Sequence, residues 1–279
     1  MAAITIKLFF PKGHPQSLCT AELSNWTGKA LAAPRSELDD LLRRDELQRS
    51  GVYLLLGPDP ETGKGAAYIG EAEEVRERIR QQCEKEFWVQ AVVFVSKDEN
   101  LTKAHIRYLE GRLIEEAQSV ARFKVLNAQP SGSRLPESDR EDMEAFLSRM
   151  TQLLPVLGCE LLTPIVDSRG SSSQRRLVGK IKGCEALGQR TAKGFVVFTG
   201  SSGVSGLRPS APAYIISARD ELKKDGALVE EENHLRFTRD CEFSSPSMAG
   251  AVICGGHVNG LTFWKDDDGR TLKEIEAAG

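Results

Sequence analysis

Two tyrosines and an arginine are the residues of this chain whose types and spacing best suit chemistry. Tyr53 ends the triplet Gly-Val-Tyr, Tyr68 begins the triplet Tyr-Ile-Gly, and Arg78 follows ten residues after Tyr68. A phenol can orient or deprotonate a water, and a guanidinium can bind a phosphate through two parallel hydrogen bonds. If these three side chains converge on one surface, they suit the hydrolysis of a phosphodiester.

A β-hairpin is the element that must position the two tyrosines. Both lie in strand-like apolar runs, 52–56 and 66–69, and the segment 57–65 between them is rich in Gly, Pro and other turn formers. Two such runs joined by such a segment predict a hairpin. Because side chains alternate between the faces of a sheet, we expect the two rings to lie near each other on one face.

A helix downstream supplies the carboxylate that the hairpin lacks. Within 101–117 the apolar residues recur at 106, 109, 113 and 117, which is helical spacing. Lys103, Arg107 and Glu110 fall on a neighbouring stripe, because residues three and four apart stack on one face of a helix. Asn127 follows after a short loop.

Taken in this order, residues 48–130 resemble a GIY-YIG nuclease domain. The resemblance rests on both triplets, Arg78, a helical Glu110 followed by Leu-Ile, and Asn127. It implies that Tyr53 positions or activates the attacking water, and that Tyr68 supports it or contacts the scissile phosphate. It also implies the roles of the remaining residues: Arg78 neutralises the transition state, Glu110 holds one divalent metal, and Asn127 orients groups beside that metal.

The metal implied at Glu110 is Mg²⁺ or Mn²⁺. A hard cation of this kind keeps several waters and needs only one or two protein carboxylates plus phosphate oxygens. It can lower the pKa of a bound water and screen charge on the leaving oxygen. The implied function is therefore a metal-dependent endonuclease that acts on DNA and uses no small-molecule cofactor.

The chain departs from the family pattern at two positions. Glu71 stands where many members have a lysine, and Gln82 stands where homing-type members have a histidine. Either change could slow the chemistry or move the proton-accepting role elsewhere. His105 is a candidate substitute, although a partly exposed helix histidine is the plainer interpretation. The alternative function is a DNA-binding or DNA-sensing module whose nuclease core is weak or inactive.

Composition is that of an ordinary globular protein. Charged residues make up 28% and hydrophobic residues 40% of the 279 residues. No apolar run approaches the roughly 20 residues of a membrane span, and the N-terminus lacks the layout of a signal peptide. Six scattered cysteines show no pair at metal-ligand spacing. These features predict a cytoplasmic protein.

The net charge of −3 gives no general sign of nucleic-acid binding. The charge is uneven, however, because a basic strip between 169 and 208 has only Glu185 against it. Such a strip could hold phosphates, or it could be a solvated linker. The tentative nucleic-acid contacts are two cations of the predicted helix and four of the strip: Lys103, Arg107, Arg175, Arg176, Lys180 and Lys182.

Shifts in composition predict four segments. Residues 1–47 form an N-terminal β-hairpin and helix extension, 48–130 the nuclease domain, 131–189 a linker with an amphipathic helix and the basic strip, and 190–279 a C-terminal accessory domain that binds DNA. The predicted class is α+β: a small antiparallel sheet flanked by helices forms the core, and a separate mixed α/β domain follows.

The C-terminal segment has motifs of its own. Residues 190–276 resemble a domain of unknown function often appended to GIY-YIG nucleases, on the strength of 244–247 (Ser-Ser-Pro-Ser), 259–260 (Asn-Gly) and 264–269. They are more distantly similar to RAMA domains, which are thought to read DNA. The acids at 266–268 could form a metal site, but a tight turn explains them better. Trp264 could stack on a base; the alternative is that it is a core tryptophan.

Overall fold

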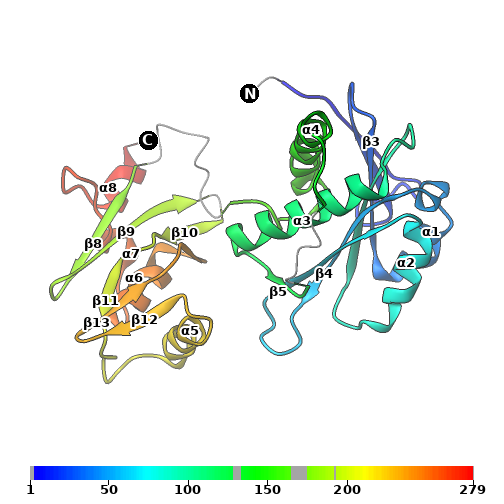
Figure 1. Cartoon of the computed structure of the whole chain (residues 1–279). Helices are drawn as coiled ribbons and strands as arrows, with labels where there is room; N and C mark the ends of the chain where they lie inside the picture. The colour runs from blue at the N-terminus through cyan, green and yellow to red at the C-terminus, as the bar shows by residue number, and fades with distance from the viewer. Residues whose placement is uncertain (1–2, 128–132, 165–174, 192, 279) are drawn as a thin grey trace. The chain divides into compact units, whose positions relative to one another are not determined.

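The computed structural model describes residues 3–127, 133–164, 175–191 and 193–278 (Figure 1). The chain divides into two compact units, Met1–Thr163 and Pro164–Gly279. Both units combine helices with sheets, so the predicted α+β class is confirmed.

The first unit is built on a seven-stranded sheet with the order β1-β2-β3-β6-β4-β5-β7. Neighbouring strands are antiparallel, except that β5 and β7 are parallel. The strands are β1 (Ile6–Phe9), β2 (Cys19–Leu23), β3 (Gly28–Pro34), β4 (Gly51–Pro58), β5 (Gly65–Ala72), β6 (Gln90–Ser96) and β7 (Lys124–Val125).

This sheet is larger than the small one predicted. The sequence predicts a separate extension over residues 1–47, whereas β3 pairs with β6 through seven residue pairs and so joins β1–β3 to the hairpin strands. Strand β3 has no strand signature in the sequence, because its alanine-rich residues include none of the β-branched types that mark most strands. The N-terminal residues therefore extend the sheet that carries Tyr53 and Tyr68.

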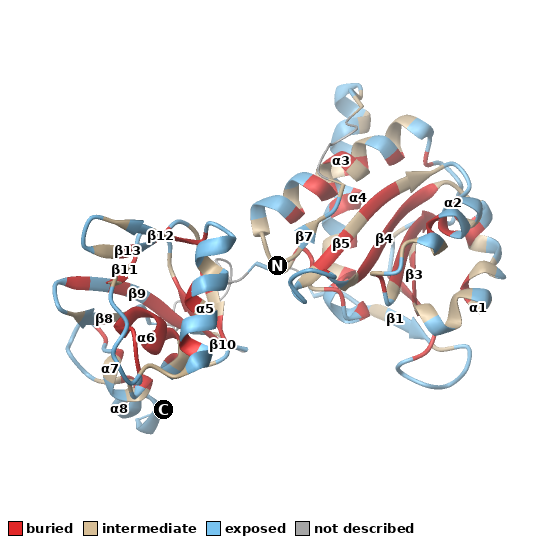
Figure 2. Cartoon of the chain, turned by 90° about the horizontal axis from the view of Figure 1, so that it is seen from below, coloured by how far each residue is buried: buried red, intermediate tan, exposed pale blue. Residues whose placement is uncertain are grey.

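Helices cover both faces of this sheet (Figure 1). Residues of α3 and α4 pack on the face that includes Val52 and Leu54, and residues of α1 and α2 pack on the face that includes Tyr53 and Leu55. The helices are η1 (Arg35–Glu37), α1 (Leu38–Leu42), η2 (Asp45–Gln48), α2 (Val75–Gln81), η3 (Gln82–Glu84), α3 (Lys103–Val120), α4 (Glu137–Leu153) and η4 (Pro155–Leu157). Strands β4 and β5 are buried along most of their length (Figure 2).

The second unit contains two smaller antiparallel sheets, ordered β14-β10-β9-β8 and β11-β13-β12. Its strands are β8 (Leu177–Ile181), β9 (Cys184–Thr191), β10 (Gly194–Val197), β11 (Ser202–Val204), β12 (Leu228–Glu231), β13 (His234–Phe237) and β14 (Cys241–Phe243). Its helices are α5 (Ala213–Lys224), α6 (Pro246–Cys254), α7 (Gly260–Phe263) and α8 (Leu272–Ala277).

The predicted linker over 131–189 differs most from the structure. Helix α4 belongs to the first unit, where its apolar face is buried in the core. Strands β8 and β9 belong to the second unit and form a hairpin closed by Lys182 and Gly183, whose φ angles are 46° and 81°. Positive φ at both central residues is the geometry of a two-residue type I′ turn. Of the predicted linker, residues 131–132 and 165–174 lie outside the described residues.

No helix within the described part of the chain is both long enough and apolar enough to cross a membrane.

Candidate active site

The β4–β5 hairpin brings the two tyrosines together as the sequence predicts. Tyr53 pairs with Gly70 and Leu55 pairs with Tyr68, so both phenols point to the face that α2 covers. Their ring centroids lie 6.3 Å apart at an interplanar angle of 25°. The rings are offset and stacked, which is a favoured arrangement for an aromatic pair.

Gly70 is required by the position of Tyr53. A Cβ atom added at Gly70 would collide with the Cζ and Oη atoms of Tyr53, because the ring lies directly over the backbone of its cross-strand partner. The missing side chain allows the phenol of Tyr53 to extend across β5. The final glycine of the Tyr-Ile-Gly triplet therefore has a steric role.

The hydroxyl of Tyr53 is buried and has no hydrogen-bond partner in the structure. Burial raises the pKa of Tyr53 above its ordinary value, and the charges of Tyr68 and Glu110 raise it further, while the Arg78 guanidinium opposes this shift. A buried hydroxyl without a partner costs about 1–3 kcal/mol, so it marks a position where the fold is not optimised for stability. Tyr53 is a neutral phenol at physiological pH.

Arg78 and Glu110 both affect the pKa of Tyr53, although they lie on helices that pack on opposite faces of the sheet. Arg78 lies on α2, on the tyrosine face, and Glu110 lies on α3, which packs on the opposite face. Strand β7 pairs with β5 only at Ala66 and Ala67, so it does not cover the part of β5 that carries Gly70. At this uncovered edge the carboxylate of Glu110 interacts electrostatically with the phenol.

Asn127 has a different part from the one that the resemblance implies. Its Oδ1 atom accepts a hydrogen bond of 3.0 Å from the Ile69 backbone N–H, and its Nδ2 atom donates to the Ile69 carbonyl. Both polar atoms of the amide thus form hydrogen bonds with the backbone of β5. Asn127 fixes the backbone between Tyr68 and Gly70, and its amide does not point a free group at a metal.

His105 has a structural role at the start of α3, and its tentative assignment as a catalytic residue stays a prediction. Its Nδ1 atom accepts from the Thr102 backbone N–H at 3.3 Å, and its own N–H donates to the Thr102 hydroxyl, forming a capping box. Its Nε2 atom lies 3.6 Å from the Asp139 carboxylate on α4. The imidazole therefore caps α3 and links it to α4.

The two cations of α3 lie beside acidic groups. Lys103 forms an ion pair of 2.7 Å with Glu73, which raises the pKa of Lys103, and Glu71 contributes in the same direction. Arg107 opposes this shift, so it lies near Lys103. The end of β5 and the start of α3 therefore carry charges of both signs rather than a basic stripe.

Lys85 is the residue that sequence reasoning missed. Its Nζ atom lies 3.8 Å from the centroid of the Tyr68 ring, which is a cation–π contact. Burial and the charge of Arg78 lower the pKa of Lys85. No pattern in the sequence could have found it, because Lys85 alternates with glutamates at 84 and 86 and has the appearance of an ordinary surface residue.

Gln82 occupies the position where the resemblance leads one to expect a histidine. Its side chain is 6% exposed, and its Oε1 atom is buried without a hydrogen-bond partner. Its backbone carbonyl accepts from the indole of Trp88 at 3.1 Å. Gln82 and Tyr53 are two of the few buried polar side chains of the described residues that lack a partner.

A single carboxylate is the metal-binding group that this region offers. In the residues that the structure describes, no group of three His, Cys, Asp or Glu side chains is placed to hold a metal ion. Glu110 acts on Tyr53 from α3. A lone carboxylate suits Mg²⁺, which retains waters and takes further oxygens from a phosphate, and does not suit zinc, which requires three or four protein ligands.

The basic strip of the second unit is dispersed by the fold. Arg175 lies 3.3 Å from the Asp266 carboxylate, and Lys180 lies 2.8 Å from Glu185. The guanidinium of Arg176 lies over the ring of Phe198 at 5.8 Å, and Lys182 lies in the β8–β9 turn. Asp266, which is distant in sequence, thus neutralises Arg175, and a count along the chain could not show this pair.

The C-terminal residues that carry the resemblance to the domain of unknown function form hydrogen bonds within the second unit. Trp264 is fully buried, and its indole donates a hydrogen bond of 3.0 Å to the carbonyl of Pro246. The Ser245 hydroxyl caps α6, and the Ser247 hydroxyl accepts from the Gly260 N–H at 3.0 Å. The core alternative for Trp264 is therefore confirmed, and base stacking by this residue is excluded.

Asp266 forms a turn, as its alternative interpretation predicts. Its carboxylate accepts from the backbone N–H groups of Asp268 and Arg270 at 3.1 and 2.9 Å, and from the Arg270 side chain at 3.0 Å. Burial opposes ionisation, but these hydrogen bonds hold the pKa of Asp266 below its ordinary value. Gly269, with φ of 82°, completes the turn.

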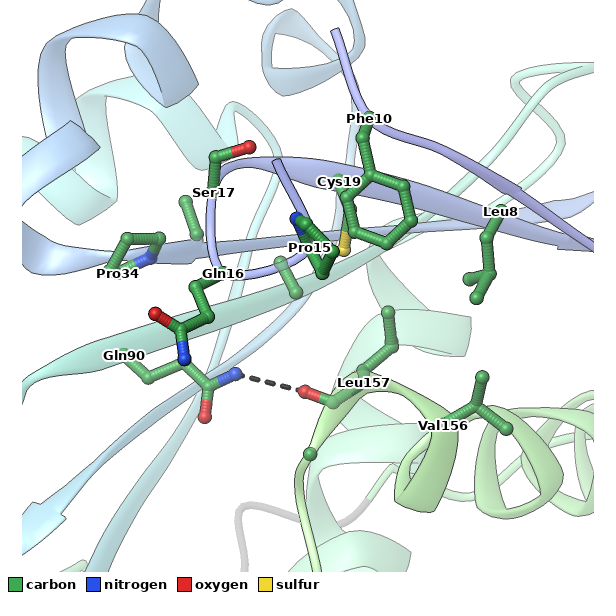
Figure 3. A pocket seen from close by; sticks show the side chains of 13 residues that line it. Leu8, Phe10, Pro15, Gln16, Ser17, Cys19, Pro34, Gln90, Val156 and Leu157 are labelled. Carbon is green, nitrogen blue, oxygen red and sulfur yellow. Dashed lines mark hydrogen bonds between the residues drawn. The ribbon is translucent and has the colours of Figure 1, made fainter. Parts of the chain in front are cut away.

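A hollow of about 330 Å³ lies elsewhere on the first unit, between the ends of the N-terminal strands and the segment around Leu157 (Figure 3). The Gln90 amide donates to the Leu157 carbonyl at 2.9 Å at its rim. Burial raises the pKa of the Cys19 thiol in its wall, so this thiol remains protonated. None of its thirteen lining residues belongs to the predicted site.

Comparison with known families gives one match. A family model described as a domain of unknown function (DUF4357) matches residues 177–276, which span β8 through most of α8. No curated protein and no solved structure matches the chain significantly.

Proposed function

We propose that this protein is a metal-dependent endonuclease of the GIY-YIG type that hydrolyses phosphodiester bonds in DNA. The observation that carries the proposal is the buried hydroxyl of Tyr53, which has no partner and is acted on electrostatically by Tyr68, Arg78 and Glu110. A fold that leaves a buried phenol unsatisfied beside a cation and a carboxylate is arranged for a ligand rather than for stability.

The raised pKa of Tyr53 defines its part in the reaction. As a neutral phenol it orients the attacking water through a hydrogen bond, and the Arg78 guanidinium acts beside it. Tyr68 supports Tyr53 through their stacked rings. Arg78 carries a permanent charge that can offset the charge developing on the phosphate.

Glu110 is the residue that would hold the metal. Mg²⁺ or Mn²⁺, when bound, would lower the pKa of a coordinated water and neutralise the leaving oxygen. Glu110 lies on a long helix whose apolar face is buried, so its backbone is held rigidly. The charge of Glu110 raises the pKa of Tyr53, which supports the proposal that the two residues act at the same site.

The test is a cleavage assay with a matched pair of arginine variants. The protein is incubated with Mg²⁺ or Mn²⁺ and a panel of single-stranded, duplex, nicked, flapped and branched DNA. Arg78→Gln should slow cleavage at least about 100-fold, since a transition-state donor is lost. Arg80→Gln is the control, because Arg80 lies on the same helix and is exposed like Arg78, but is paired with Glu77.

Two outcomes would contradict the nuclease proposal. One is the absence of cleavage of every structure in the panel by the wild-type protein. The other is equal cleavage by Arg78→Gln and Arg80→Gln, which would assign the activity to a different site or to a contaminant.

A second candidate function is a DNA-binding module with a weak or inactive core. It is favoured by Glu71, whose negative charge acts on Lys103 beside the site, and by the buried, unpartnered amide of Gln82. This function requires saturable DNA binding in the absence of cleavage. Restoring the family residues through Glu71→Lys and Gln82→His should then produce cleavage in a protein that had none.

A further inference from the structure

Arg78 and Lys85 are neighbouring cations without an acidic partner. The Nζ atom of Lys85 lies 3.8 Å from the centroid of the Tyr68 ring, which stacks on the Tyr53 ring. The charge of Arg78 acts on both Lys85 and Tyr53. The Arg78 side chain contacts the Gln81 amide oxygen at 3.3 Å and also acts on the Tyr53 hydroxyl, and neither Arg78 nor Lys85 forms an ion pair with any described carboxylate. Two like charges held near each other are unfavourable unless an anion lies between them.

Several other cations of this region have acidic partners. Arg44 pairs with Glu46 at 2.7 Å, Lys103 pairs with Glu73 at 2.7 Å, and Arg80 pairs with Glu77. The contrast shows that acids are available nearby and that the fold does not direct them to Arg78 and Lys85. Arg78 and Lys85 therefore lack an ion-pair partner among the described carboxylates, although the Glu110 carboxylate also acts on Tyr53.

The backbone of Lys85 is held from behind by a single guanidinium. Arg35 donates to the carbonyls of Lys85 at 2.6 Å, Cys83 at 2.7 Å and Trp88 at 3.3 Å. Its guanidinium also stacks on the Trp88 ring at 4.4 Å. An arginine that binds three carbonyls of one short segment fixes the shape of that segment.

Two further contacts complete this support. The Trp88 indole donates to the Gln82 carbonyl at 3.1 Å, and the Lys85 N–H donates to the same carbonyl at 3.1 Å. Gly57 of β4 allows the chain to pass closely, since a Cβ atom there would collide with the Phe87 carbonyl. Lys85 thus projects over Tyr68 from a loop whose backbone is preorganised, which reduces the entropic cost of binding a ligand.

We propose that Lys85 is a phosphate-binding residue of the site. Lys85 and Arg78 together hold one phosphate group of a phosphodiester across the face of Tyr68. The ligand class is a phosphate monoanion or pyrophosphate-like anion. This assignment rests on the proposed nuclease function for its biological substrate, but the anion site itself follows from the two unpaired cations.

The first experiment measures anion binding without catalysis. The full-length protein, labelled with ¹³C at lysine Cε, is titrated with inorganic pyrophosphate in the absence of divalent metal, and the Lys85 signal is assigned with Lys85→Arg. We expect a saturable shift of the Lys85 signal, and an affinity about tenfold weaker in Arg78→Gln, as expected for the loss of one charge-assisted contact. The signal of Lys7, an exposed lysine on β1, is the internal control.

The second experiment measures cleavage. Lys85→Met keeps the aliphatic stem over Tyr68 and should lower kcat about 10²-fold, whereas Lys85→Arg should retain most of the rate. Lys7→Gln removes a lysine charge at the far edge of the sheet and should leave the rate unchanged. The backbone contacts of Arg35 do not involve the Lys85 side chain, so these variants should fold normally.

The results separate the two proposals. A saturable Lys85 shift in a protein that cleaves no DNA would support the anion site and overturn the nuclease function. Normal cleavage by Lys85→Met, or a Lys85 signal that moves no more than that of Lys7, would overturn the assignment of Lys85 and leave the nuclease proposal standing.

Discussion

The β4–β5 hairpin of the first unit and the segment around Trp264 and Asp266 in the second unit, here called the C-terminal motif, differ in how their polar groups are bonded. In the hairpin, the hydroxyl of Tyr53 is buried without a partner and Arg78 lacks an acid. In the C-terminal motif, the indole of Trp264 and the carboxylate of Asp266 are both hydrogen-bonded and buried. A buried polar group without a hydrogen-bond partner indicates a functional site, whereas buried polar groups that bond to one another indicate a structural role.

The same distinction applies to positive charge. Arg78 and Lys85 act on each other and form no ion pair with a described carboxylate, although neither belongs to a basic run in the sequence. The strip from Arg175 to Lys193 is basic in the sequence, but the fold pairs Arg175 with Asp266 and Arg190 with Glu276. Charge density along the chain is therefore a poorer guide to an anion site than the pairing of each cation in the folded protein.

The largest effect should come from Glu110→Gln. Cleavage in Mg²⁺ should fall to background, because a neutral amide holds a hard divalent cation poorly. The fold should be preserved, since Glu110 is half-buried on α3 and glutamine is an equally good helix former. Initial rates and far-ultraviolet circular dichroism test this expectation. The matched control is Glu115→Gln, on the same helix and paired with Arg112 at 2.7 Å. Retained activity in Glu110→Gln would assign the metal to another carboxylate.

Tyr53→Phe should separate activity from stability. We expect cleavage to fall about 10²-fold, while the free energy of unfolding stays the same or rises by about 1 kcal/mol, since an unsatisfied buried hydroxyl is removed. Tyr108→Phe is the opposite case, because the Tyr108 hydroxyl donates to Glu144 at 2.6 Å. That variant should lose about 1 kcal/mol of stability and keep its activity. A destabilised Tyr53→Phe protein would mean that the hydroxyl has a structural partner.

Trp264→Phe should act on stability alone. The change removes the hydrogen bond to the Pro246 carbonyl and leaves a cavity beside Phe195, whose ring centroid lies 4.4 Å away. We expect the second unit to lose about 2–4 kcal/mol, measured by calorimetric unfolding. DNA affinity below the melting temperature should be unchanged. Tyr214→Phe, at an exposed position, is the control and should have little effect. A loss of affinity without a loss of stability would contradict the architectural role of the motif.

The smallest effect should be on the salt dependence of DNA binding. Arg176 and Lys182 are the cations of the strip's described hairpin that lack a carboxylate partner, whereas Arg175 and Lys180 are paired. If the second unit contacts DNA, the double variant Arg176→Gln with Lys182→Gln should reduce the slope of log affinity against log salt by at most about 2. Arg175→Gln with Lys180→Gln should change it less. Fluorescence anisotropy on one duplex compares the slopes, and equal reductions would mean that pairing does not decide which cations bind phosphate.

The sequence alone determined the local elements and much of the site. Alternation of apolar residues around a turn-rich segment fixed the hairpin of Tyr53 and Tyr68, and helical spacing placed Glu110 on α3. These features are local, because strand and helix periodicities arise from backbone geometry over a few residues. The α+β class followed from the same patterns.

Tertiary structure decided which groups meet and which are left without partners. It brought Lys85 over Tyr68, gave His105 to a helix cap, committed the Asn127 amide to Ile69, and dispersed the basic strip. It also joined β3 to β6, between residues about 60 positions apart. Pairing between distant segments depends on how the whole sheet and its helices pack, and no periodicity within one segment records it.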